Sequence, residues 1–133
     1  MFNLLSLVVA VVAVSGTVLP RAAQIVTKVG VTQTGGYATY YNQFGGYGAC
    51  GQKNPDSAII VALQSQRYDA SLCGHSVSIT NTKTKKTITA RIEDNCPGCA
   101  NDNSLDLSIG AWEAIGQSTS DGSEVPITWK LLN

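Results

Sequence analysis

Acidic residues and two cysteines are concentrated in one short stretch of the chain. Asp94 and Asp106 stand near its ends, and Cys96 and Cys99 lie between them around a Pro-Gly pair. Paired carboxylates can act on glycosidic bonds when one is an acid of raised pKa and the other a base or nucleophile. Aspartates also serve commonly in turns and near helix starts, where they accept backbone N–H bonds. The stretch therefore predicts either reacting carboxylates or a loop that two aspartates hold in place.

The cysteines support two interpretations, a set of disulfides or a metal site. The sequence has four cysteines, which allow three pairings if all are oxidised. The alternative is a zinc site of three thiolates and the imidazole of His75, which would leave Cys50 as a free thiol. The even count and the secretion signal described below favour disulfides. We therefore expect neither a metal nor a cofactor.

Aromatic residues around the first predicted strand could form a sugar-binding surface. Exposed rings stack on the apolar faces of sugars, as they do on other flat ligands. About half of the rings should instead point into the core, because successive side chains of a strand alternate between its faces. The residues are Tyr37, Tyr40, Tyr41, Phe44 and Tyr47. No Ser-His-Asp or Cys-His arrangement is indicated, since the chain has a single histidine among its cysteines.

The first 16 residues have the pattern of a signal peptide. Residues 4–14 form an apolar run of eleven, which suits a signal-peptide core and is too short to span a bilayer. Residues 17–34 show no clear periodicity and are expected to form a flexible tail or pro-segment. Residues 35–133 then make one small domain, for which disulfides are available after secretion. We expect a secreted, extracellular protein.

Charge and hydropathy argue against two classes of partner. Arg21 and Lys28 precede residue 35, so the domain has seven basic and nine acidic residues. Its one dense basic cluster, Lys83, Lys85 and Lys86, lies in a predicted turn, where solvated lysines are ordinary. No later run is long and apolar enough for a transmembrane helix. We expect a monomer without a nucleic-acid or membrane partner.

Hydropathy patterns predict a chain built mainly of strands. Residues 76–81 and 87–93 alternate polar and apolar on either side of a Thr-Lys turn, which indicates a hairpin. Residues 59–63 form the continuous apolar run of a fully buried strand. Further strands are expected at 37–41 and at 125–131, where Pro126 predicts a start at a sheet edge.

One short helix is expected before the last strand. Ser108 is a suitable N-cap for a helix over residues 109–115, and Gly116 is a suitable stop. Five or six strands at this spacing, joined by long Gly-rich connections, indicate a small barrel.

The order of these motifs resembles that of expansin-like domains. The matching motifs are Gly-Tyr-Ala-Thr-Tyr-Tyr (36–41), Gly-Ala-Cys-Gly (48–51), Cys-Gly-His-Ser-Val (73–77), Asp-Asn-Cys-Pro-Gly-Cys (94–99), Leu-Asp-Leu-Ser (105–108) and Ile-Thr-Trp (127–129). The chain is similar to single-domain fungal members of the rare lipoprotein A-like, barwin-like superfamily. These include the loosenins and the riboflavin aldehyde-forming enzyme-like proteins. The resemblance implies a mainly β fold, a six-stranded double-psi β-barrel with one or two short helices, and an open polysaccharide-binding groove.

The resemblance also implies roles for individual residues. Asp106 matches the aspartate that expansins need for wall loosening, which corresponds to the general acid of the related family-45 endoglucanases. Asp94 and Thr39 match groove residues that hydrogen-bond around it, and Tyr40 or Tyr41 would help to line the groove.

The same resemblance implies the disulfide pairing. By analogy with barwin, Cys50 pairs with Cys73, and Cys96 and Cys99 pair with each other. Each bridge would stabilise the domain by about 2–4 kcal/mol.

Two departures from the family pattern direct the functional hypothesis. The endoglucanases carry a second carboxylate, the base, on the first strand, whereas residues 37–41 contain no acid. Two-domain expansins carry a carbohydrate-binding module after the barrel, whereas this sequence ends after the last strand, so we expect affinity for wall polymers to be weak or to depend on the barrel alone. The leading hypothesis is a secreted protein that binds and loosens cell-wall polysaccharide, such as cellulose, chitin or a peptidoglycan-like glycan, without hydrolysis.

Two other functions stay open at this point. Small barrels of the superfamily include inhibitors of papain-type cysteine proteases, whose contact surface here would be exposed loops such as residues 43–51. A weak glycanase or lytic transglycosylase is the other alternative, since a lytic transglycosylase needs no activated water.

Overall fold

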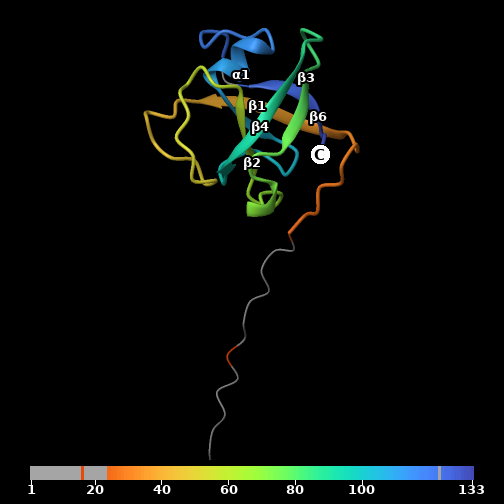
Figure 1. Ribbon diagram of the computed structural model, residues 1–133. Coiled ribbons are helices and arrows are strands. Elements are labelled where there is room, and N and C mark those ends of the chain that lie inside the picture. Colours follow the sequence, from red (N-terminus) through yellow and green to blue (C-terminus); the bar gives the residue numbers. More distant parts are fainter. Residues whose placement is uncertain (1–15, 17–23, 123) are drawn as a thin grey trace, which may run out of the picture.

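Six strands close into one barrel, with short helical segments at its ends (Figure 1). The computed structural model describes residues 16, 24–122 and 124–133, so the expected signal peptide lies outside the described residues except for its last position. The strands are β1 (Gln33–Tyr41), β2 (Ile60–Gln64), β3 (Ser76–Asn81), β4 (Thr87–Cys96), β5 (Leu105–Ser108) and β6 (Val125–Leu131). The helical segments are α1 (Ile109–Ala114) and the 3₁₀ helix η1 (Ala70–Leu72).

The strands follow the order β1-β5-β2-β4-β3-β6 around the barrel, and β6 returns to β1. β1 pairs with β5 in parallel, as β2 does with β4, and the remaining neighbours are antiparallel. The connections from β1 to β2 and from β4 to β5 each join strands that are not neighbours, because β5 lies between β1 and β2, and β2 lies between β4 and β5. The predicted mainly β, six-stranded double-psi barrel is confirmed.

Alternating apolar side chains fill the barrel interior. Val77 and Ile79 of β3, like Ile127 and Trp129 of β6, are at most 2% exposed. Each such aliphatic side chain contributes about 1.5–3 kcal/mol when it is fully buried. Helix α1 covers one end of the barrel, where Trp112 joins this core (Figure 1). In the described part of the chain, none of the helices has the length and apolar character needed to cross a membrane.

Most predicted elements occur at the expected positions. The strands at 76–81 and 125–131 have the predicted bounds, and residues 60–63 of β2 are buried on both faces. Ser108 caps α1 by accepting a hydrogen bond from Ala111 N at 3.1 Å. The edge predicted from Pro126 is wrong, because β6 lies between β1 and β3 in a closed barrel.

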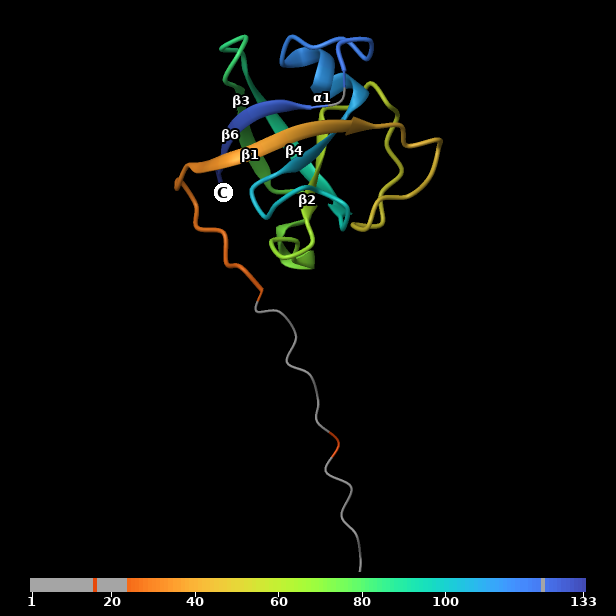
Figure 2. The same ribbon diagram turned by 180° about the vertical axis from the view of Figure 1, so that it is seen from behind.

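The chain contacts the barrel before residue 35. Residues 24–32 run along its surface, and β1 already begins at Gln33 (Figure 2). Gly30 N donates to the carbonyl oxygen of Leu131 at 2.8 Å. Arg67, which is buried, reaches the same segment and donates to the hydroxyl of Thr27 at 3.1 Å. These contacts hold the segment that precedes β1 in place along β6.

Candidate functional site

An open groove of about 410 Å³ lies over neighbouring strands of the barrel wall. Tyr37, Thr39 and Tyr41 line it from β1, because alternate residues of a strand share one face. Asp94 of β4 and Asp106 of β5 line the same space. The structure thus brings together four of the residues predicted for the site.

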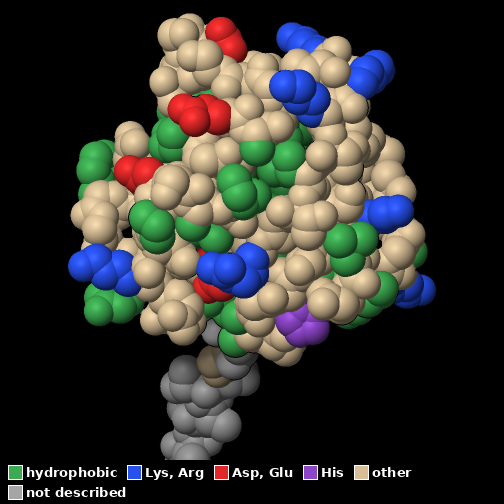
Figure 3. Space-filling model, turned by 45° about the horizontal axis from the view of Figure 1, so that its top comes forward, with side chains coloured by type: hydrophobic (Ala, Val, Ile, Leu, Met, Phe, Trp, Pro, Cys, Tyr) green, Lys and Arg blue, Asp and Glu red, His purple; other side chains and the backbone are tan. Residues whose placement is uncertain are grey.

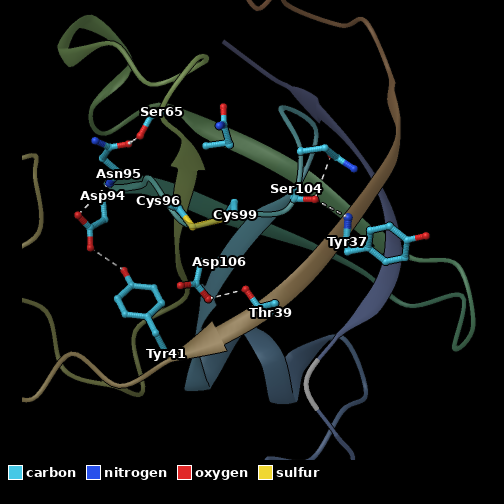
Figure 4. The surroundings of a disulfide bond; sticks show 12 residues. Tyr37, Thr39, Tyr41, Ser65, Asp94, Asn95, Cys96, Cys99, Ser104 and Asp106 are labelled. Atoms are coloured by element: carbon cyan, nitrogen blue, oxygen red, sulfur yellow. Dashed lines mark hydrogen bonds between the residues drawn. A yellow bond between two sulfur atoms is a disulfide. The ribbon is translucent and has the colours of Figure 1, made fainter.

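Asp106 lies at the centre of these groove-lining residues. The leucines on either side of it in β5 are fully buried, so Asp106 points to the opposite face and into the groove. In the parallel pairing of β1 with β5 it lies opposite Thr39. The Thr39 hydroxyl donates to Asp106 Oδ1 at 2.9 Å (Figure 4). The register of two strands therefore sets both the position and the orientation of this carboxyl.

The environment of Asp106 favours its protonated form. Burial is the main cause and raises the pKa of its carboxyl above the ordinary value. The hydrogen bond from Thr39 acts in the opposite sense, and the negative charge of Asp94 adds to the upward shift. In its protonated form this carboxyl can both donate and accept hydrogen bonds.

Asp94 holds a loop as well as lining the groove. It and Asp106 both lie opposite Ala62 of β2, which separates their Cα atoms by two inter-strand spacings, about 10 Å. Its Oδ1 accepts from the backbone N–H groups of Ala49 at 2.7 Å and Asn95 at 2.8 Å. The Asp94 carboxylate thus joins the β1–β2 connection to the end of β4.

Tyr41 completes the hydrogen bonds of Asp94. Its hydroxyl donates to Asp94 Oδ2 at 3.1 Å (Figure 4). Burial, followed by the charge of Asp94, raises the pKa of the Tyr41 hydroxyl, which therefore stays protonated as a donor. Both oxygens of Asp94 are thus occupied, whereas Asp106 Oδ2 has no partner among the described residues.

A disulfide forms part of the groove wall. Cys96 and Cys99 are bonded to each other, and both line the groove with Pro97 and Gly98 (Figure 4). The second disulfide joins Cys50 to Cys73, so the pairing is the one that the resemblance implied. The thiolates of the alternative zinc site are thereby divided between two disulfides, and no cluster of metal ligands occurs among the described residues.

Tyr40 lies apart from the other predicted site residues. Its ring packs against Trp112 with centroids 5.0 Å apart, and its hydroxyl donates to the carbonyl oxygen of Thr119 at 2.7 Å. The structure therefore selects Tyr41 from the predicted alternatives. Strand periodicity could have given this result, because residues 39 and 41 share a face that residue 40 does not.

The groove also contains a carboxylate that sequence reasoning missed. Glu124 lines it from just before β6 and is exposed. Because Val125 pairs with Ala38 in antiparallel register, Glu124 lies beside Thr39 of β1. No local motif marks this residue, because only the register of β6 on β1 brings it to the groove.

This barrel and its sequence are similar to those of known proteins, although no family model matches the chain. A variant of the Clavibacter michiganensis expansin in complex with cellohexaose superposes with a TM-score of 0.65. The two are 29% identical, over 77% of this chain and 51% of that one. The chain belongs to the expansin-like double-psi β-barrel superfamily.

The chain is also similar to other proteins. The Streptomyces papain inhibitor is 30% identical with a TM-score of 0.66, over 80% of this chain and 99% of that one. The putative ripening-related protein 6 of Oryza sativa subsp. japonica is 31% identical over 90 residues, which are 64% of this chain and 53% of the relative. The match thus spans about half the length of both the rice relative and the expansin. The superfamily resemblance predicted from motif order is confirmed.

Proposed function

We propose that this protein is secreted, binds cell-wall polysaccharide in the groove and loosens contacts between glycan chains without hydrolysis. The observation that carries the proposal is the Thr39–Asp106 hydrogen bond at the centre of an open groove. The similarity to an expansin with bound cellohexaose supports a glycan as the ligand. The disulfides support an extracellular location, since such bonds persist in oxidising compartments.

Asp106 acts in this proposal by exchanging hydrogen bonds with a sugar oxygen. Thr39 fixes the orientation of its carboxyl through Oδ1, and Oδ2 faces the groove side of the strand. Because burial raises the pKa of Asp106, its carboxyl stays protonated to a higher pH than that of an exposed aspartate, so it can donate a hydrogen bond over a wider pH range. A donor placed there competes with the hydrogen bonds between polysaccharide chains, which separates the chains while their covalent bonds stay intact.

The arrangement of carboxylates favours a non-hydrolytic action. Inverting hydrolysis needs a base about 6.5–9.5 Å from the acid, with room for a water molecule. Strand β1 has no acidic residue, and Asp94 is occupied by three hydrogen-bond donors. Glu124 is the remaining carboxylate of the groove, and its exposed position favours solvation over activation of a bound water.

The decisive test compares the wild type with Asp106→Asn and Glu124→Gln variants on insoluble cellulose and chitin. Binding, mechanical weakening of the polymer and release of soluble sugar are measured in parallel. We expect weakening without sugar release in the wild type, and loss of weakening in Asp106→Asn. Sugar release that either substitution removes would establish a glycanase or lytic transglycosylase instead. Undiminished weakening by Asp106→Asn would refute the role given to that residue.

Inhibition of a papain-type protease is a second candidate function. Phe44 and Tyr47, in the long connection after β1, are 88% and 76% exposed. Phe44 also has a φ of 50°, in the left-handed region that a bulky residue rarely adopts. Such a strained loop, attached through the Cys50–Cys73 disulfide, presents rings that a protease cleft could accept. The 30% identity to the Streptomyces papain inhibitor supports this candidate.

Papain assays separate the two candidates. An inhibitor that acts through the loop would lose potency in Phe44→Ala and keep it in Asp106→Asn. Absence of inhibition by the wild type would remove this candidate and leave the glycan hypothesis untouched.

A further inference from the structure

The groove carries negative charge that no basic side chain balances. Asp94, Asp106 and Glu124 line it, and among the described lining residues there is no lysine or arginine. The negative fields of Asp94 and Glu124 add within the groove, and Asp106 adds a third where it is ionised.

The described basic residues of the barrel lie outside the groove lining. Arg67 is buried against the N-terminal segment, and Arg91 is hydrogen-bonded to Glu93. A group of basic side chains occupies one corner of the molecule (Figure 3). The turn between β3 and β4 carries three lysines, and none of them lines the groove. Among the residues that the structure describes, the groove lining therefore has no basic side chain that could pair with an anionic sugar.

When they are ionised, these carboxylates can only accept hydrogen bonds. Asp106 Oδ2 and both oxygens of Glu124 make no hydrogen bond with any residue that the structure describes. A carboxylate accepts hydrogen bonds and attracts cations, so the groove favours ligands that offer hydroxyl or ammonium donors.

An exposed ring stands beside this charge. Tyr37 is 39% exposed and lines the groove on the same strand face as Thr39. Its partner in β6 is Pro126, two positions after Glu124, so ring and carboxylate belong to the same end of the groove. A flat apolar surface next to a carboxylate matches the chemistry of an amino sugar, which has an apolar ring face and a cationic substituent.

From this arrangement we infer that the groove selects glycans with free amino groups, such as partly deacetylated chitin, over neutral glycans, and disfavours polyuronates. Glu124 is the residue that sets this preference, because it is the exposed carboxylate whose oxygens are not engaged by described residues. The inference rests on the proposed glycan-binding function and names its substrate class.

Calorimetry with three oligosaccharides of equal length tests the inference: glucosamine hexamer, N-acetylglucosamine hexamer and oligogalacturonate. At low ionic strength and about pH 6, above the ordinary carboxyl pKa of about 4, the glucosamine hexamer should bind about tenfold more tightly than the acetylated one, or about 1.4 kcal/mol. This advantage should shrink in about 0.5 M salt, which screens charges beyond a few ångströms. Oligogalacturonate should bind most weakly.

The Glu124→Gln variant should lose about threefold in affinity for the glucosamine hexamer and little for the acetylated one. Glu113→Gln is the matched control, since it removes an equal charge from an exposed position of α1 outside the groove. Equal affinity of the wild type for both hexamers, or equal effects of the two substitutions, would overturn the inference. If none of the three ligands bound and cellohexaose did not bind either, the proposed function itself would fail. Tight binding of the acetylated hexamer alone would leave the function intact and remove the amine preference.

Discussion

The two disulfides should contribute unequally to stability, which paired Cys→Ser substitutions can measure. Cys50 and Cys73 are 23 positions apart, whereas Cys96 and Cys99 are 3 apart. Because a cross-link restricts the unfolded chain more when its loop is longer, loop closure predicts about 3.4 kcal/mol for the first bond and about 1.6 kcal/mol for the second. At about 4–8 °C per kcal/mol for a domain of this size, the melting temperature should fall by roughly 14–27 °C and 6–13 °C respectively.

For glycan binding we expect the opposite ranking: loss of the Cys96–Cys99 disulfide should weaken binding more than loss of the Cys50–Cys73 disulfide. Cys96 and Cys99 line the groove, so without their disulfide this part of the groove wall is no longer cross-linked. Loss of the other disulfide leaves the loop attached to β4, because the backbone N–H of Cys50 still donates to the carbonyl oxygen of Glu93 at 3.2 Å. At a temperature where both variants are folded, the Cys96→Ser/Cys99→Ser variant should therefore bind cellohexaose more weakly than the Cys50→Ser/Cys73→Ser variant.

Thermal and urea denaturation without reductant measure the first ranking, and calorimetry measures the second. A variant without the short-range disulfide that unfolded as easily as the other would refute the loop-closure reasoning. Equal binding by the two variants would show that the disulfide does not shape the groove.

Four further substitutions test particular contacts. Gly48→Ala should lower the free energy of unfolding by about 1–3 kcal/mol in urea, since the added Cβ would lie 2.4 Å from a carbonyl oxygen of β4; an unchanged midpoint would contradict this close packing. Asn81→Ala should lower the free energy of unfolding by about 3 kcal/mol, because each buried group left unpaired costs about 1–3 kcal/mol. The Asn81 side chain is hydrogen-bonded to backbone groups on two sides. A loss of stability no larger than that of an exposed substitution would refute this prediction. Thr39→Val should raise the pKa of Asp106, because it removes a hydrogen bond to the ionised form, and Asp94→Asn should lower it, because it removes a like charge. Carboxyl NMR titrations in which both substitutions moved the pKa in the same direction would contradict one of these two causes.

The raised pKa of Asp106 also predicts a pH dependence of stability. A carboxyl whose pKa is higher in the folded state stabilises the fold fully below its unfolded pKa, about 3.9, and this contribution is lost as pH rises through the folded pKa. Asp106→Asn should therefore be more stable than the wild type near neutral pH, and the difference should vanish in acid. A difference that grew as the pH fell would show that the carboxyl is stabilised in its ionised form.

The predictions that succeeded from residue patterns were local ones. The bounds of β3 and β6 follow from alternating side chains, and the start of α1 follows from Ser108 as an N-cap. Each of these signals is contained in a few neighbouring residues. The assignment of Asp106 came from the family resemblance, since residue type alone could not separate it from an aspartate in a turn.

What the sequence could not predict depends on the pairing of distant strands. β5 has only four residues, and its strand character depends on β1 and β2 on either side. Glu124 reaches the groove only through the register of β6, and Asn81 becomes a buried partner only when α1 packs over the β3–β4 turn. Such contacts join residues far apart in the chain, so no local period marks them.

The central claim is that glycan binds in the groove at Asp106, and a ¹⁵N NMR titration with cellohexaose tests it most directly. Chemical-shift changes should concentrate on Thr39, Tyr41 and Asp106, and should be strongly reduced in Asp106→Asn. Changes confined to residues 43–51, or an Asp106→Asn variant with an unaltered response, would contradict the account.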